Sequence, residues 1–220
     1  MHFPNFPDKH KEEALITPKR NMVYRKARGR YPNFTPPQGV IIVYQRALLN
    51  YIITNYPVNQ TDGFLGNFYL LEDTNNQVGV CGNFGFGSPI ISLLVEDLFV
   101  FGVRRFLSIG TAGSLQRSLQ LGSIVVCDRA IRDEGTSHHY LPSEKYAYPS
   151  PLLQQRIVAA INDLGLDYVT GPTWTIDAPY RETVAEVSHY REEGVLTVEM
   201  EAAALFAIAQ YHNFEAGAIF

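Results

Sequence analysis

Apolar residues recur along this chain with two spacings, which predict alternating strands and helices. Short apolar runs predict strands at 40–44, 104–110, 122–131, 168–176 and 194–199, and a further strand that begins at Glu215. Apolar residues at helical spacing predict helices at 45–55, 89–101 and 152–164, a short helix after 183 and an alanine-rich helix after Glu201. The runs 68–73 and 77–82 flank Asn75 and Asn76, which predicts a β-hairpin.

This order of elements predicts an α/β fold with a largely parallel sheet, because strands that alternate with helices usually pair in parallel. In such sheets, sites form in the loops beyond the carboxyl ends of the strands. Thr111, Tyr180, Glu199 and Glu201 all follow predicted strands at such ends. These residues are therefore the first candidates for function.

Composition limits the classes of protein that the chain can represent. Apolar residues make up 46% of its 220 residues, which allows a sizeable core and argues against disorder. The net charge of −4 argues against a dedicated nucleic-acid-binding protein. The first residues lack the apolar core of a signal peptide, and no run is long enough to cross a membrane. We therefore expect a cytoplasmic protein with neither nucleic acid nor membrane as a partner.

The two cysteines, Cys81 and Cys127, both end apolar runs. They lack the spacing of a zinc site or of a disulfide framework, so we expect buried thiols. The adjacent His138 and His139 of "GTSHHY" would point to opposite sides of an extended chain. Polar loop residues explain them better than a metal site does, and no metal is expected.

Positive charge is concentrated at the start of the chain. Of the 18 lysines and arginines, eight lie within the first 30 residues: Lys9, Lys11, Lys19, Arg20, Arg25, Lys26, Arg28 and Arg30. The proline-rich segment 31–39 separates them from the first strong strand, which divides the chain into a basic N-terminal arm, 1–39, and a domain, 40–220. The arm fits two interpretations, a solvated and partly flexible segment or a segment that binds anions.

Two glycine-rich loops could contact a ligand. In "SIGTAGSLQ" (108–116), backbone N–H groups and the Thr111 hydroxyl could cradle a phosphate or a sugar oxygen, although an ordinary tight turn explains the same residues. In "GNFGFGSP" (82–89), the glycines at 82, 85 and 87 have the wrong spacing for a dinucleotide-binding loop. A dinucleotide-dependent enzyme is therefore disfavoured.

Glu199 and Glu201 flank Met200 where a predicted strand meets the alanine-rich helix. Carboxylates at the edge of an apolar core need partners. One carboxylate can accept both hydrogen bonds of a vicinal diol, which favours a sugar ligand. Glu201 could instead stabilise the helix N-terminus through the helix dipole. The residues alone leave both interpretations open.

Four segments together resemble the nucleoside phosphorylase family that includes uridine phosphorylase and the hexameric type of purine nucleoside phosphorylase. In chain order they are "FLSIGTAGSLQ", "AIRDEGTSHHYLP", "DAPYRET" and "VEMEAAALF", and the resemblance covers residues 40–220. The second segment looks most like the uridine-specific branch. The resemblance implies a three-layer α/β/α sandwich with a central mixed, largely parallel sheet. It also implies homo-oligomers built from dimers, such as hexamers.

The resemblance further implies phosphorolysis, in which phosphate attacks the anomeric carbon of a nucleoside and releases the base and ribose 1-phosphate. Phosphate is then a co-substrate, and no metal or organic cofactor is needed. The residues that would contact the ribose are Glu201, Met200 and Glu199. The residues that would hold phosphate are the amide of Gly110 and Thr111. Tyr180 would pack on the base, and Arg181 would hydrogen-bond a pyrimidine carbonyl.

This chain departs from the family pattern at three places. Ser108 stands where the family often has an arginine, and "VYQRALL" (43–49) replaces the usual glycine–aspartate–proline turn. We expect Arg46, or Arg28 and Arg30 reaching a neighbouring subunit, to supply the missing positive charge for phosphate. The purine branch has a catalytic aspartate beyond the position of Phe220, so we expect the chain to lack the end of its last strand and a final helix, and no catalytic acid can be named. A nucleoside hydrolase and a non-catalytic nucleoside-binding homologue remain as alternatives.

Overall fold

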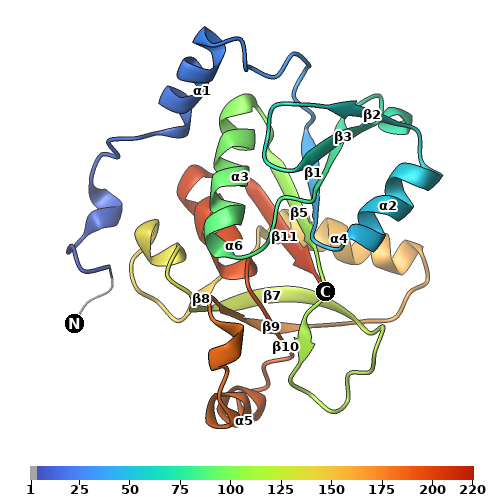
Figure 1. The fold of residues 1–220 in the computed structure, drawn as a ribbon. Coiled ribbons are helices and arrows are strands. Elements are labelled where there is room, and N and C mark those ends of the chain that lie inside the picture. Colours follow the sequence, from blue (N-terminus) through green and yellow to red (C-terminus); the bar gives the residue numbers. More distant parts are fainter. Residues whose placement is uncertain (1–3) are drawn as a thin grey trace.

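A computed structural model describes residues 4–220, which form one mixed sheet between layers of helices (Figure 1). The strands are β1 (Gly39–Val43), β2 (Val58–Thr61), β3 (Asn67–Leu71), β4 (Val78–Gly82), β5 (Arg105–Ile109), β6 (Gly113–Ser114), β7 (Ile124–Asp133), β8 (Tyr146–Ala147), β9 (Tyr168–Ile176), β10 (Thr197–Glu199) and β11 (Glu215–Ile219). Their order in the sheet is β2-β3-β4-β1-β5-β11-β7-β9-β10-β6, and β8 pairs with β7. The central strands β4, β1, β5 and β11 pair in parallel, and so do β7, β9 and β10, as the sequence predicts for a largely parallel sheet. The antiparallel pairs involve β2, β3, β6, β8 and the contact of β11 with β7.

Helices cover both faces of the sheet, so the predicted three-layer sandwich is confirmed. The helices α3 (Ser88–Phe101) and α6 (Ala202–His212) share one apolar cluster with Ile42 of β1. The helix α2 (Arg46–Asn55) packs with Val43, which points to the opposite face because side chains alternate along a strand. The helix α4 (Pro151–Asp163) packs beside β7 and β11, and α5 (Val184–Glu192) lies at one end of the molecule (Figure 1).

The predicted hairpin at 68–82 is confirmed. Strands β3 and β4 pair antiparallel, and Asn75 and Asn76 between them have φ values of 52° and 59°. Asparagine tolerates this left-handed conformation better than most residues do. Cys81 and Cys127 are buried and unpaired, as expected. Strands β2, β6 and β8 were not predicted, because they are short and carry little apolar alternation.

The strand β11 lies in the middle of the sheet. It pairs with β5 in parallel from Glu215 to Ile219, and Phe220 exchanges two backbone hydrogen bonds with Val125 of β7. Helices contact both faces of β11: α6 packs on one, and a Cβ atom at Gly217 would lie 2.6 Å from Ile157 of α4 on the other. The further strand and helix that the family resemblance implies stay a prediction.

The basic arm contains a docked helix that the sequence analysis missed. The helix α1 (Pro18–Ala27) begins at Thr17, whose hydroxyl accepts a hydrogen bond from the Arg20 amide, and it buries Met22 against the domain. Arg25 forms an ion pair of 3.3 Å with Asp97 of α3 and donates to the Gly63 carbonyl. This part of the arm is therefore a helix that contacts the domain, whereas the flexibility and the anion binding of the arm stay predictions. The signal was weak because α1 buries one side chain rather than an apolar stripe.

In residues 4–220 we find no helix with the length and apolar character that crossing a membrane requires.

Gly66 sits where β3 begins against the turn that follows β4, and we predict that Gly66→Ala destabilises the protein. Its φ of +73° disfavours a side chain, and a Cβ atom would lie 2.3 Å from the Gly82 carbonyl oxygen and 2.8 Å from Phe84 Cβ. We expect the free energy of unfolding to fall by more than about 2 kcal/mol, which lowers Tm by roughly 4–8 °C.

Gly165→Ala is the matched control. Gly165 has a φ of +65°, but its Cβ atom would meet nothing within 4 Å. It should therefore lose only about 1–2 kcal/mol for its backbone conformation. Equal losses of Tm for the two variants would contradict the steric explanation.

Candidate active site

A cavity of about 270 Å³ opens where several strands end. Its lining residues are Tyr44, Gln45, Phe86, Gly110, Thr111, Glu199, Met200, Glu201 and Phe220. These residues follow β1, β4, β5, β10 and β11 in the chain. The cavity therefore lies at the carboxyl ends of strands, where the sequence predicted a site. It brings together Thr111, Glu199, Met200 and Glu201.

Glu199 holds the junction between β10 and α6. Its Oε2 accepts hydrogen bonds of 2.7 Å from the backbone amides of Glu201 and Ala202, the first residues of the helix turn. Its Oε1 accepts a 2.5 Å bond from the Thr175 hydroxyl of β9. Only 7% of Glu199 is exposed. Its carboxylate is thus engaged in shaping the backbone, and its expected contact with base or sugar is not supported by this geometry.

Glu201 faces the cavity from the first position of the same turn. Its Oε1 accepts a 2.5 Å hydrogen bond from the Gly87 amide, and the Ser88 hydroxyl donates to the Met200 carbonyl at 2.8 Å. These two bonds join the turn before α3 to the segment 199–201. A carboxylate has about four acceptor sites, so the bond from Gly87 leaves capacity for ligand hydroxyls.

The two carboxyl groups raise each other's cost of ionisation inside the protein. Burial, and then the charge of Glu201, raise the pKa of Glu199 to about 8, although its three hydrogen bonds act in the opposite direction. Burial also raises the pKa of Glu201. Burial therefore makes ionisation less favourable for both carboxyl groups.

The lining also contains Tyr44, whose hydroxyl is a neutral group. The Ser108 hydroxyl donates to the Tyr44 hydroxyl at 3.3 Å. Burial, and then the charge of Glu201, raise the pKa of Tyr44 well above its usual value, so this phenol stays protonated. The described lining contains no lysine or arginine. Arg46 comes nearest in the chain, because it follows Gln45 at the start of α2 and is exposed.

The amide of Gly110, which the family resemblance assigns to phosphate, is already engaged. It donates to the Ile219 carbonyl at 3.1 Å and so extends the pairing of β5 with β11. A Cβ atom at Gly110 would lie 3.2 Å from the Tyr44 ring. Gly110 thus allows a close approach of two segments, and Thr111 is the donor that this loop presents to a ligand.

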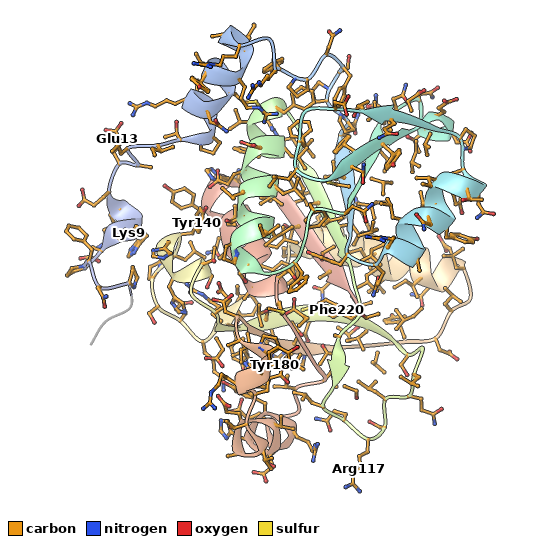
Figure 2. All side chains as sticks on the ribbon, viewed as in Figure 1. Lys9, Glu13, Arg117, Tyr140, Tyr180 and Phe220 are labelled. Carbon is orange, nitrogen blue, oxygen red and sulfur yellow. The ribbon has the colours of Figure 1, made fainter. Side chains whose placement is uncertain are left out.

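Five predicted site residues are absent from the cavity lining: Arg46, described above, and Tyr180, Arg181, Arg28 and Arg30. Tyr180 is fully exposed in the short turn Pro179–Arg181, and Arg181 is exposed beside it. Figure 2 shows Tyr180 toward the end of the molecule that carries α5. Packing of the base on Tyr180 is therefore not supported within one chain.

Arg28 and Arg30 follow α1, which packs near the end of α3 distant from the cavity. That end is marked by Phe101, on which the ring of Tyr31 packs at 5.9 Å. A helix of this length separates Phe101 from Ser88 by about 20 Å. Arg28 and Arg30 cannot reach the cavity of their own chain, and their approach to a neighbouring subunit stays a prediction.

Four lining residues were missed by the sequence analysis, and one of them is Phe220, which follows β11. Tyr44 and Gln45 lie in the segment that departs from the family pattern, and Phe86 lies in the glycine turn that was tested only as a dinucleotide loop. The placement of an aromatic residue between two glycines was the available signal for Phe86. Within residues 4–220, no group of three or more histidine, cysteine, aspartate or glutamate residues is placed to hold a metal ion.

Comparisons with known proteins match this chain to one family. A family model described as "Phosphorylase superfamily" matches residues 46–220. A guanosine phosphorylase from Halorubrum lacusprofundi is 37% identical over 135 residues, covering 61% of this chain and 56% of the relative. A uridine phosphorylase from Haemophilus influenzae is 28% identical over 159 residues, covering 66% and 63%. The chain thus spans about three fifths of the length of these curated relatives.

A solved structure shows the same fold. The crystal structure of a uridine phosphorylase from Vibrio fischeri superposes with a TM-score of 0.75 at 26% sequence identity. The superposition covers 85% of this chain and 78% of that one.

The raised pKa of Glu199 predicts that the protein loses stability as the pH rises. The ordinary value is 4.5 and the folded value is about 8, so the folded state holds an extra proton between these limits. This contribution is fully present below pH 4.5 and is lost as the pH rises through 8. We expect the free energy of unfolding, measured with urea, to fall by a few kcal/mol at most from pH 5 to pH 8.

Glu199→Gln should flatten this pH dependence, because the amide preserves the shape of the side chain but cannot ionise. Glu72→Gln is the control, since Glu72 is an exposed carboxyl away from the cavity. If the free energy of unfolding of Glu199→Gln falls with pH as steeply as that of the unmodified protein, another group titrates.

Proposed function

The chain belongs to the phosphorylase superfamily, and from this premise we propose that it cleaves the N-glycosidic bond of a nucleoside with phosphate as the acceptor. The products are the free base and ribose 1-phosphate. A uridine-like nucleoside is favoured, and a purine nucleoside such as guanosine is the second candidate. The observation that carries the proposal is the convergence of Glu201, Met200 and Thr111 on one cavity.

The lining supports a division of tasks in this reaction. Glu201 accepts hydrogen bonds from the ribose hydroxyls, and Met200 provides an apolar surface for the sugar. Glu199 acts as a positioning residue, because it holds the backbone amide of Glu201. Fixing the sugar in this way lowers the entropic part of the barrier.

Electrostatics support the same reaction. The sugar develops positive charge as the glycosidic bond breaks, and a buried carboxylate beside it stabilises that charge more strongly than water would. The hydroxyls of Tyr44 and Thr111 are the neutral donors available to a phosphate oxygen. Arg46, on the adjacent helix turn, is the cation that we assign to phosphate.

A nucleoside hydrolase is the second candidate, and one observation favours it. The described cavity lining has no cationic side chain, and Ser108 stands where the family often has arginine. Water would then replace phosphate. Incubation with uridine, guanosine or inosine, with and without phosphate, separates the cases: ribose 1-phosphate identifies the phosphorylase, free ribose the hydrolase, and binding without turnover a non-catalytic homologue.

We also propose a cytoplasmic homo-oligomer built from dimers. Two buried, unpaired cysteines are compatible with a reducing compartment. Gel filtration coupled to light scattering would measure the assembly.

Glu201→Ala should lower kcat/KM for ribonucleosides while the fold is kept. Losing a hydrogen bond to a charged group costs about 1.5–3 kcal/mol, which corresponds to roughly a tenfold to hundredfold loss. The unmodified enzyme should prefer a ribonucleoside to its 2′-deoxy analogue. Glu72→Ala, at an exposed position, is the control. Unchanged kinetics of Glu201→Ala would remove Glu201 from the sugar site.

Arg46→Ala should raise the KM for phosphate several-fold and leave the KM for the nucleoside nearly unchanged, because charge-assisted hydrogen bonds to phosphate are lost. Arg117→Ala is the matched control, since Arg117 is an exposed arginine in a loop away from the lining (Figure 2). The same assay on Arg28→Ala and Arg30→Ala tests a contribution from a neighbouring subunit. If the KM for phosphate is unchanged in Arg46→Ala, Arg28→Ala and Arg30→Ala, the hydrolase gains support.

A further inference from the structure

A buried hydroxyl on β9 links that strand to the start of α6. Thr175 is fully buried and lies directly beside Glu199 in the parallel pair of β9 and β10. The Thr175 hydroxyl donates to Glu199 Oε1 at 2.5 Å and accepts the Ala203 amide at 3.0 Å. One hydroxyl therefore joins the carboxyl group to the helix that follows it.

Three consecutive backbone amides at the start of α6 find their partners here. Glu199 Oε2 accepts the amides of Glu201 and Ala202, and the Thr175 oxygen accepts the amide of Ala203. Amides in the first turn of a helix have no partner within the helix, and leaving one unpaired inside a protein is unfavourable. Thr175 and Glu199 together fix the backbone from which the Glu201 side chain reaches the cavity.

The hydroxyl acts on the charge of Glu199 as well as on its orientation. The Ala203 amide donates to the Thr175 oxygen, so the hydroxyl proton is available to Glu199 Oε1. Burial raises the pKa of Glu199 to about 8, and the bond from Thr175 acts in the opposite direction because it stabilises the carboxylate. Loss of the hydroxyl would therefore loosen this carboxyl group and make its ionisation harder.

The preceding inward-facing threonine of β9 lacks these contacts. Thr173 is also fully buried, and it pairs with Thr197 of β10. Its hydroxyl donates to the Thr197 carbonyl at 3.2 Å and lies 3.0 Å from the Thr197 hydroxyl. These bonds join the two strands without involving either carboxyl group. Thr173 therefore matches Thr175 in residue type, burial and strand, but not in its link to the site.

We propose that Thr175 is a positioning residue for the reaction, because its hydroxyl holds Glu199, and Glu199 holds the amide of the residue that receives the ribose. The two hydrogen bonds of this series measure 2.5 Å, from Thr175 to Glu199, and 2.7 Å, from the Glu201 amide to Glu199. The inference rests on the proposed function and extends it to a residue outside the cavity lining.

Steady-state kinetics of matched variants test the inference. Thr175→Val removes the hydroxyl and keeps the branched shape of the side chain, whereas Thr175→Ser keeps the hydroxyl. We expect kcat/KM for a ribonucleoside to fall roughly tenfold in Thr175→Val, as for loss of a hydrogen bond to a charged group. The loss should be smaller for the 2′-deoxy analogue, since Glu201 receives the ribose hydroxyls. Thr175→Ser should retain most of the activity, and Thr173→Val is the matched control.

The pH dependence of unfolding gives a readout that a loss of packing does not move. Without the hydroxyl, the pKa of Glu199 should rise further above its ordinary value of 4.5. The loss of stability that the unmodified protein shows as the pH rises through 8 should then shift to higher pH in Thr175→Val, but not in Thr173→Val. A packing defect would instead lower the free energy of unfolding equally at every pH.

Three other titratable groups face Glu199. They are Glu201, Tyr44 and Cys127. Burial raises the pKa values of Tyr44 and Cys127 well above their ordinary values, so both groups stay neutral over this pH range. Glu201 is the same in the unmodified protein and in each variant. The shift between Thr175→Val and Thr173→Val therefore reports on Glu199.

Two outcomes would overturn the inference alone. One is a Thr175→Val variant whose kinetics and pH dependence match those of the unmodified protein, and the other is an equal change in Thr175→Val and Thr173→Val. If Thr175→Val does not fold, Thr175→Ser is compared with Thr175→Ala, because this pair also differs by the hydroxyl, and equal kinetics of the two would contradict the inference. If the unmodified protein cleaves no nucleoside, the proposed function fails and the inference fails with it, so the unmodified protein tells the two failures apart.

Discussion

The carboxylate of Glu199 fixes the point where β10 becomes α6, and the cavity is arranged around that point. Three donors converge on it, from Thr175 and from the amides of Glu201 and Ala202. A helix begins with amide groups that lack partners, and this carboxylate satisfies two of them inside the protein. The next carboxylate, Glu201, is turned toward the cavity as a result and holds the turn before α3.

Burying two carboxyl groups close together costs free energy of folding. The groups around them show how this cost is limited. Hydrogen bonds from backbone and hydroxyl groups stabilise the charge on Glu199, while the raised pKa of the pair allows a proton to remain. Neutral hydroxyls rather than cations complete the described lining. The described lining thus pairs acidic side chains with neutral hydroxyls and contains no lysine or arginine.

The sequence predicted most of the fold because the apolar runs of the long strands and helices match their periods. It also located Glu199, Met200, Glu201 and Thr111, since these residues follow strands whose ends form the cavity. It could not show that the Glu199 carboxylate accepts hydrogen bonds from backbone amides and from Thr175 of β9. Such partners are set by the tertiary structure. For the same reason Phe86 was missed: it lines the cavity together with Tyr44, Gly110 and Glu201, which come from separate segments of the chain.

Helix α1 escaped prediction for a different reason. Its stability comes from an ion pair and one buried methionine rather than from a continuous apolar face. Tyr180 illustrates the limit of transfer by motif. Tyr180 lies in the expected segment, yet it is fully exposed in the described chain.

The central place of β11 has a consequence for how the chain folds during synthesis. Strands β1 to β5 on one side of it and β7, β9 and β10 on the other are joined in the sheet only through β11, which follows all of them in the sequence. Until residues 215–219 leave the ribosome, the described chain can form at most two partial sheets, each with an open edge beside β5 or β7. Closure of the sheet and completion of the cavity are then one late event, so a nascent chain stalled before β11 exposes strand edges that chaperones must protect.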